Sequence, residues 1–245
     1  MQEVHQSSAM DAIFVFSEIA QYSLRAAAKR PATLGDDMKT FAEIAFTPAV
    51  QALQAAAGSR DAYASMQAES DPGEGLGARE AAFLANADSF FLATVGETGW
   101  PYVQHRGGPR GFLKVLGPTR LAYADFRGNR QYVSAGNASR DDRASIIVMD
   151  YPNRQRLKLL GRLRFEEPGQ AGEALTSSVE LKGYRARLER VAVFEVEASD
   201  WNCPQHITPR FTLEEVESAS RPLRERITAL EAEVADLRRG ALITE

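Results

Sequence analysis

From residue 89 onward, the chain is divided into short apolar runs that glycine and proline interrupt. Seven of these runs are rich in β-branched and aromatic residues, and they cover residues 90–95, 102–106, 112–116, 121–124, 145–149, 157–160 and 191–196. Runs of this length with tight connections are typical of antiparallel strands, since parallel strands need long crossover segments between them. The sequence therefore predicts an antiparallel barrel or sandwich rather than alternating βα units.

Helical patterns flank these strands. Apolar residues recur at helical spacing in the first 87 residues, for example at Ile13, Phe16 and Leu24, and Thr47-Pro48 has the sequence of a helix N-terminus. Short helices are predicted around 78–85 and, as a single helix, over 171–188. The class is therefore α+β. We expect an N-terminal helical extension over 1–40, a barrel domain over 41–211 and a C-terminal helix over 212–245.

The C-terminal helix carries a heptad pattern. Its apolar positions follow alternating steps of four and three, at Val216, Ser220, Leu223, Ile227, Leu230, Val234, Leu237 and Ala241. One interpretation is a self-associating coiled coil, and the other is a single amphipathic helix lying on its own barrel. Ser220 weakens the apolar seam, and about three heptads is a marginal length for a coiled coil, so both interpretations stay open.

Composition excludes several classes of function. The net charge of −4 gives no general attraction to nucleic acid. One cysteine and three histidines do not form a typical zinc ligand set or a disulfide framework, so we expect no metal. No apolar stretch approaches the length of a membrane span, and the short run at 12–16 is a poor signal peptide. The expected localisation is cytoplasmic.

Candidate binding residues are densest between Trp100 and Asn137. His105, Arg106 and Arg110 surround Gly107, and a second basic group, Arg127-Gly-Asn-Arg-Gln131, follows two strands later. If the two groups converge, their guanidinium groups and backbone N–H groups can bind one phosphate, and glycine lets the ligand approach the backbone. The alternative is that both are solvated turns with structural glycines.

Several segments in this part of the chain resemble the FMN-binding split-barrel flavoproteins of the pyridoxamine 5'-phosphate oxidase-like family. They are Phe91-Leu-Ala-Thr-Val95, Gly99-Trp-Pro-Tyr-Val-Gln-His-Arg-Gly-Gly-Pro109, Gly111-Phe-Leu-Lys-Val115, Ala124-Asp-Phe-Arg-Gly-Asn-Arg-Gln-Tyr132 and Met149-Asp-Tyr-Pro-Asn-Arg154. The resemblance runs from about Phe46 to Phe211 and is specific because the motifs occur in the family's order. It implies a split β-barrel with non-covalent FMN at the interface of a homodimer.

The resemblance also assigns roles to individual residues. Gln104, His105 and Arg106, with Gly107, would lie beside the flavin ring and its ribityl phosphate, with Arg106 as a phosphate ligand. Asp125 would end a strand that contacts the flavin, and Asn129 and Arg130 would close on the phosphate from the other side. Further candidates for cofactor binding are Ser134 and Asn137 on the next helix and, towards the flavin of a partner subunit, Trp201, Gln205 or His206.

The resemblance leaves the substrate open. A pyridoxamine phosphate oxidase carries a C-terminal Trp-Gly segment with an arginine for pyridoxal phosphate, and Trp201-Asn-Cys-Pro-Gln-His206 does not match it. The expected function is redox chemistry on a small molecule through FMN, with NADH or NADPH as a candidate reductant and no catalytic residue assigned. The alternatives are a non-catalytic flavin- or heme-binding module, an oligomerisation scaffold, or a protein that binds a deazaflavin instead of FMN.

Overall fold

The computed structural model describes residues 38–70, 75–201 and 204–242. The expected helices of residues 1–37 and the cysteine at 203 lie outside this part of the chain. The remainder divides into two compact units. Within the described ranges, the first contains the residues up to 149 and those from 155 to 201, and the second contains residues 150–154 and 204–242.

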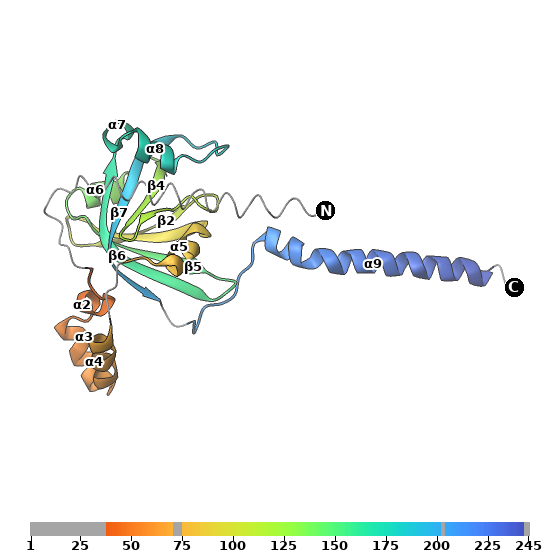
Figure 1. The fold of residues 1–245 in the computed structure, drawn as a ribbon, viewed down its shortest axis with the longest axis horizontal. Helices are drawn as coiled ribbons and strands as arrows, with labels where there is room; N and C mark the ends of the chain where they lie inside the picture. Colours follow the sequence, from red (N-terminus) through yellow and green to blue (C-terminus); the bar gives the residue numbers. More distant parts are fainter. Residues whose placement is uncertain (1–37, 71–74, 202–203, 243–245) are drawn as a thin grey trace. The chain divides into compact units, whose positions relative to one another are not determined.

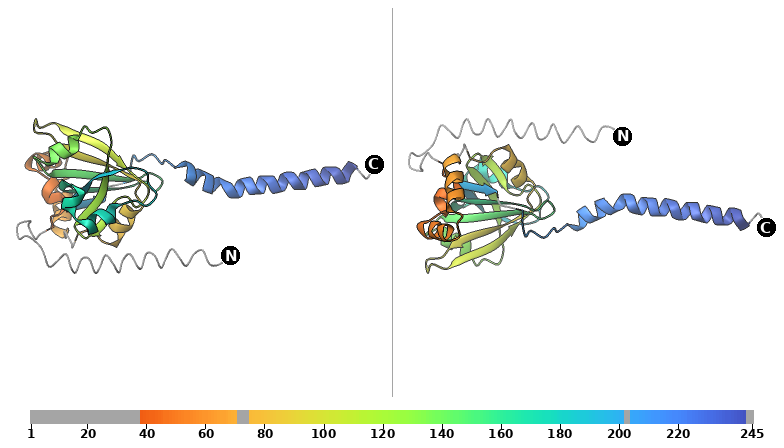
Figure 2. Two further views of the ribbon diagram at one scale, coloured as in Figure 1. Left: turned by 90° about the horizontal axis from the view of Figure 1, so that it is seen from above. Right: turned by 90° about the horizontal axis from the view of Figure 1, so that it is seen from below.

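Seven strands form one sheet in the order β2-β1-β5-β6-β7-β4-β3. Their bounds are β1 Ser89–Val95, β2 Pro101–Gly107, β3 Lys114–Gly117, β4 Arg120–Phe126, β5 Arg143–Asp150, β6 Gln155–Glu166 and β7 Leu188–Trp201. The sheet is antiparallel and strongly curled, as Figure 1 and both views of Figure 2 show. The predicted seven strands and the α+β split-barrel class are confirmed.

The barrel encloses a core of aromatic and branched side chains. Along β1, buried and partly buried residues alternate, as a strand with one face on a core requires. Phe90 stacks on Phe112 with ring centroids 5.7 Å apart and meets the edge of Tyr123 at 5.2 Å. Leu92 and Phe194 are fully buried in the same cluster. Burial of these side chains provides most of the free energy that holds the strands together.

The first unit also contains short helices outside the sheet. They are α2 Phe41–Ala45, α3 Pro48–Ala56, α4 Arg60–Glu69, α5 Ala78–Ala85, α6 Val133–Ala138, α7 Pro168–Ala171 and α8 Glu173–Val179. As predicted, Thr47 caps α3: its side-chain oxygen accepts from the backbone N–H of Val50, and proline follows at the first helical position. The predicted helix at 78–85 is also confirmed, as α5.

The single helix expected over 171–188 is wrong. The structure has α7 and α8 on either side of Gly172, whose φ of +83° lies in the left-handed region and breaks the helical path. Helix α8 ends at Val179, and Gly183, with a φ of +78°, lies in the following loop. The helical spacing of the apolar residues concealed both breaks.

Strands β6 and β7 are much longer than the apolar runs that predicted them. They pair over most of their length, from Leu157 opposite Trp201 to Glu166 opposite Val191. The register shifts at Gly161, where an added Cβ would lie 2.0 Å from the carbonyl oxygen of Glu195. Only glycine fits so close an approach of two backbones. Charged side chains on the outer face of these strands interrupt the apolar pattern, so the sequence shows only part of each strand.

The second unit contains α9, Leu213–Leu242, a continuous 30-residue helix (Figure 1). Its N-terminus has a capping box, in which the backbone N–H of Thr212 donates to Glu215 at 2.8 Å and the N–H of Glu215 donates to the Thr212 hydroxyl at 3.2 Å. The predicted C-terminal helix is therefore confirmed. Within the described ranges, no helix is both long enough and apolar enough to cross a membrane.

Candidate functional site

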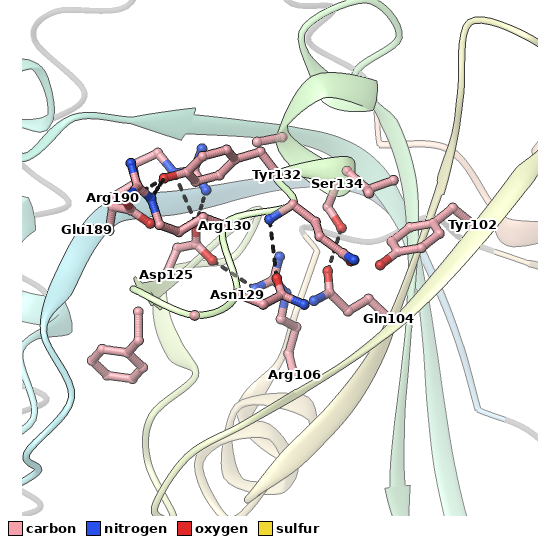
Figure 3. Close-up of a pocket in the computed structure, with 15 residues that line it drawn as sticks. Tyr102, Gln104, Arg106, Asp125, Asn129, Arg130, Tyr132, Ser134, Glu189 and Arg190 are labelled. Atoms are coloured by element: carbon pink, nitrogen blue, oxygen red, sulfur yellow. Dashed lines mark hydrogen bonds and ion pairs between the residues drawn. The ribbon is translucent and has the colours of Figure 1, made fainter.

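One open pocket, about 430 Å³ including the solvent at its mouth, lies between β2, the ends of β4 and β7, and the loop that leads into α6 (Figure 3). It is lined by Tyr102, Gln104 and Arg106 of β2, Asp125 and Phe126 of β4, residues 128–132 of the loop, Val133, Ser134 and Ala135 of α6, and Glu189 and Arg190 of β7. Arg106 of the first basic group and Arg130 of the second therefore meet at one site, as the phosphate hypothesis requires, whereas Arg110 and Arg127 do not line it.

Strand β2 presents alternate residues to this pocket. Tyr102, Gln104 and Arg106 are partly buried and line it, whereas the residues between them are exposed. His105 lies on the opposite face of the strand, where its ring meets the edge of Phe91 at 5.6 Å. Gly107, at the end of β2, does not line the pocket.

Asp125 organises the inner wall of the pocket. Its side chain is 3% exposed, and its two oxygens are held by two arginines. Oδ1 accepts from Nη1 of Arg106 at 2.8 Å, and Oδ2 accepts from Nη2 and Nε of Arg190 at 2.5 and 3.0 Å. Arg190 lies directly opposite Asp125 in the β4–β7 register. Pairing across the sheet thus fixes the position of one arginine, and the carboxylate fixes the second.

A second polar chain closes the rim of the pocket. Nε of Arg130 donates to the Tyr132 hydroxyl at 3.2 Å, and that hydroxyl donates to Glu189 at 2.7 Å. The hydrogen bond to Tyr132 raises the pKa of Arg130, which stays charged. Arg130 and Tyr132 have φ angles of 62° and 56°, a left-handed conformation that costs free energy in residues other than glycine. Strained backbone of this kind is concentrated at functional sites.

Helix α6 supplies the third side of the pocket. Its Ser134 is 1% exposed and donates its hydroxyl proton to Oε1 of Gln104 at 2.9 Å, which leaves the amide N–H groups of Gln104 as donors. Asn137 does not line the pocket, and its amide donates to the hydroxyl of Thr94 at 3.0 Å. It therefore joins α6 to β1.

The pocket carries a positive charge that its own carboxylates do not balance. Three arginines, Arg106, Arg130 and Arg190, face two acids, Asp125 and Glu189. In addition, Nε of Arg106 is buried and has no hydrogen-bond partner among the described residues. A buried donor without a partner is costly, and an anionic ligand would supply the missing acceptor. The arrangement is therefore suited to binding a phosphate.

The candidates from the late part of the sequence do not line this pocket. Nε1 of Trp201 donates to Glu80 at 2.6 Å, its ring meets Phe83 at 4.8 Å, and the Arg79 guanidinium lies 4.1 Å from the ring centroid. Trp201 is thus bound to α5 and does not line the pocket. Gln205 and His206 belong to the second unit, are exposed and do not line it either. Their expected contact with a partner's flavin stays a prediction.

Comparison with known proteins identifies the family. Residues 76–203, just over half of the chain, match the family model of pyridoxamine 5'-phosphate oxidase. The chain belongs to the pyridoxamine 5'-phosphate oxidase family. The resemblance stated from the sequence motifs is therefore confirmed. No curated protein matches the chain.

Several solved structures are similar to this family member. HupZ of Group A Streptococcus is 14% identical, with 56% of this chain and 99% of that chain covered and a TM-score of 0.41. An FMN-binding protein from Syntrophomonas wolfei is 14% identical, with 49% of this chain and 81% of that chain covered and a TM-score of 0.38. A protein of the pyridoxinephosphate oxidase family from Clostridium acetobutylicum, related to general stress protein 26, is 12% identical. The comparison covers 55% of this chain and 92% of that chain, with a TM-score of 0.37. Similarities this low carry no argument about ligand or activity.

Sequence reasoning missed several residues that line the pocket of this family member, among them Tyr102, Tyr132, Glu189 and Arg190. Tyr102 could have been found, because it precedes Gln104 and Arg106 at the spacing of one strand face. Tyr132 is the last residue of the segment 124–132, which was recognised as resembling the family, but it was not named as a candidate. Glu189 and Arg190 follow more than 60 residues after Asp125, and only the β4–β7 register brings them to the site. Among the described residues, no group of three His, Cys, Asp or Glu side chains is placed to hold a metal.

Proposed function

We propose that this protein binds FMN non-covalently in the Arg106–Arg130 pocket and uses it in redox chemistry on a small molecule. The observation that carries the proposal is the partly neutralised arginine cluster, in which the buried Nε of Arg106 has no hydrogen-bond partner among the described residues and the pocket has a net positive charge. A phosphate monoester carries a charge near −2 at neutral pH and has several acceptor oxygens. It would balance this charge and accept from Nε.

The remaining lining fits the rest of the flavin. An isoalloxazine ring has a polar edge with hydrogen-bond acceptors and two apolar faces. The Gln104 amide, fixed through Ser134, offers donors for such an edge, and the Tyr102 ring offers an aromatic surface on the same face of β2.

Each group of the protein has a distinct role in the proposal. Arg106 and Arg130 bind the phosphate, and Asp125 positions Arg106 and Arg190. Gln104 orients the ring, and the net positive charge favours a ligand that carries negative charge. Bound FMN supplies the hydride and electron chemistry that no protein side chain offers. For the substrate we propose only a class, namely a small molecule that exchanges two electrons with the flavin.

The test combines a change in the protein with a change in the ligand. Apo-protein is titrated with FMN and with riboflavin, which lacks the phosphate, and flavin fluorescence is measured. Arg106→Ala should raise the Kd for FMN roughly thirtyfold, since a charge-assisted hydrogen bond to phosphate contributes about 2 kcal/mol. It should change the Kd for riboflavin little. Arg120→Ala is the control, because Arg120 pairs with Glu195 at the start of β4 and does not line the pocket.

The outcomes separate the parts of the proposal. An equal loss for FMN and riboflavin would show that Arg106 does not bind the phosphate. If neither flavin binds, the FMN assignment is wrong, and the mass of any co-purifying molecule then decides between a deazaflavin and another ligand. Anaerobic reduction of the FMN complex by NADH or NADPH, followed by transfer to an acceptor, supports an enzyme. Binding without reduction by any donor tested supports a flavin-binding module instead.

A further inference from the structure

Helix α9 exposes a stripe of apolar side chains along its length. Val216, Leu223, Ile227, Leu230, Val234 and Leu237 are between 41% and 68% exposed. Burial of large aliphatic side chains is strongly favourable, and an isolated helix gains little stability without it. Burial of this stripe against another surface would therefore stabilise α9.

The stripe has the residue types of a two-stranded parallel coiled coil. The four-three spacing assigns Ile227 and Val234 to the a positions of the heptad and Leu223, Leu230 and Leu237 to the d positions. β-Branched residues at a combined with leucine at d favour two parallel strands over three or four. Ser220 occupies the preceding a position, and its hydroxyl donates to the backbone carbonyl of Val216 at 2.7 Å, so its polar group is satisfied within the helix.

Charged residues flank the stripe in a complementary order. Arg226 and Glu233 lie at g positions, and Glu231 and Arg238 lie at e positions. In a parallel pair, each g residue faces the e residue five positions later in the other helix. Arg226 would then face Glu231 of the partner subunit, and Glu233 would face the partner subunit's Arg238. Twofold symmetry repeats both pairs, so each dimer would contain four attractive pairs.

These flanking charges have no oppositely charged neighbour three or four positions away in their own helix. The residues three and four positions from Arg226 are Pro222, Leu223, Ala229 and Leu230, and those around Glu231 are Ile227, Thr228, Val234 and Ala235. On the outer face, in contrast, Asp236 and Arg239 form an ion pair at helical spacing. The charges beside the stripe are therefore arranged for another helix rather than for their own.

We propose that α9 pairs with α9 of a second copy of this chain as a parallel two-stranded coiled coil over residues 216–237. The charges alone also suit an antiparallel pair, in which Arg226 would meet the partner subunit's Glu233. The direction follows from the core, because only the parallel pair stacks β-branched residues on β-branched residues and leucine on leucine. A parallel coil connects both barrels to the same end of the pair.

Disulfide trapping in the full-length chain tests self-association at this helix even if the barrels also associate. Cys203, the only natural cysteine, is replaced by serine throughout. Leu237→Cys places a thiol at a d position near one end of the coil, and Glu225→Cys places one on the outer face as the control. Mild oxidation should link two chains rapidly through position 237 and slowly through position 225. Equal rates at the two positions, or no linkage, would overturn the proposal.

A charge exchange tests the direction. Arg226→Glu creates two repulsive pairs per parallel dimer and should weaken self-association roughly tenfold, seen as slower linkage through position 237. Adding Glu231→Arg restores opposite charges and should restore the rate. In an antiparallel pair the double variant would be worse than either single change, and Ser220→Cys would link to Leu237→Cys in a mixture of the two variants. Either result would refute the parallel coil.

Discussion

At the scale of single residues, the candidate site depends on one carboxylate. Asp125 is nearly fully buried and binds two arginines, which are 18% and 16% exposed. Without the Asp125 carboxylate, the guanidinium groups of Arg106 and Arg190 would repel each other, and both would be partly desolvated. The same arrangement leaves the pocket cationic, because one negative charge does not neutralise Arg106 and Arg190 together. Asp125 therefore stabilises the fold and still leaves charge for an anionic ligand.

Asp125→Asn should strongly destabilise the barrel. The substitution keeps the shape of the side chain but removes the charge that compensates two arginines, and loss of one partner of a buried ion pair costs about 3 kcal/mol. Urea unfolding followed by tryptophan fluorescence measures the change. The control is Glu97→Gln, since Glu97 and Arg140 form an ion pair that is 65% and 70% exposed and contributes at most about 1 kcal/mol. Equal stability of the two variants would contradict the role of Asp125.

The sequence predicted those site residues that lie close together along the chain. Gln104, Arg106, Asn129 and Arg130 belong to motifs whose glycines and arginines identify a phosphate site, and all four line the pocket. The alternation of β2 could have separated His105 from them, because neighbours on a strand point to opposite faces. The contribution of Arg190 depends on which strand pairs with β4 and in what register, which no local pattern specifies.

At the scale of elements, turn residues determined what could be predicted. All seven strands were found because glycine and proline mark their ends, and Thr47-Pro48 marked the start of α3. The region after β6 was misjudged because Gly172 and Gly183 lie within a helix-like pattern. The extent of β6 and β7 was underestimated because arginine and glutamate on their outer faces form ion pairs between strands, such as Arg162 with Glu197. In a short stretch of sequence such residues are visible only as polar residues, because their partners lie on the neighbouring strand.

The link between α5 and β7 gives a prediction about pH. Burial alone would raise the pKa of Glu80, but hydrogen bonds from Trp201 and from backbone N–H groups, with the charge of Arg79, outweigh it and lower this pKa below 4.5. A lowered folded-state pKa stabilises the fold above the unfolded pKa, and this stabilisation is lost as pH falls through the folded pKa. Glu80→Gln should therefore lower the Tm at pH 7, by an amount that shrinks towards zero below about pH 4.

Trp201→Phe separates this effect from packing. It removes the Nε1 donor but keeps an aromatic ring against Phe83. In that background, the effect of Glu80→Gln should depend less on pH, because the first hydrogen bond that lowers the pKa is gone. Thermal unfolding at a series of pH values measures both differences. A Glu80→Gln effect that is the same at pH 7 and pH 4 would show that the charge of Glu80 contributes nothing to stability.

At the scale of the whole molecule, the two compact units are expected to respond to different partners. Both tryptophans, Trp100 and Trp201, lie in the first unit, so fluorescence follows the barrel alone. Far-ultraviolet circular dichroism also follows α9, which is the longest helix of the described chain. The barrel has its own buried core, whereas α9 has exposed apolar side chains along its length.

FMN and the charge reversal at residue 226 should therefore act on separate transitions. A ligand at a hundred times its Kd stabilises the state that binds it by about 2.7 kcal/mol, so FMN should clearly raise the midpoint of the fluorescence transition in the natural chain. In Arg106→Ala the same concentration is only about three times the Kd, so the rise should shrink to about a third. Arg226→Glu should lower the helical transition seen by circular dichroism and leave the fluorescence midpoint unchanged. If FMN raises both midpoints equally and Arg226→Glu lowers both, the barrel and α9 unfold as one unit, and the separation into two units does not hold in solution.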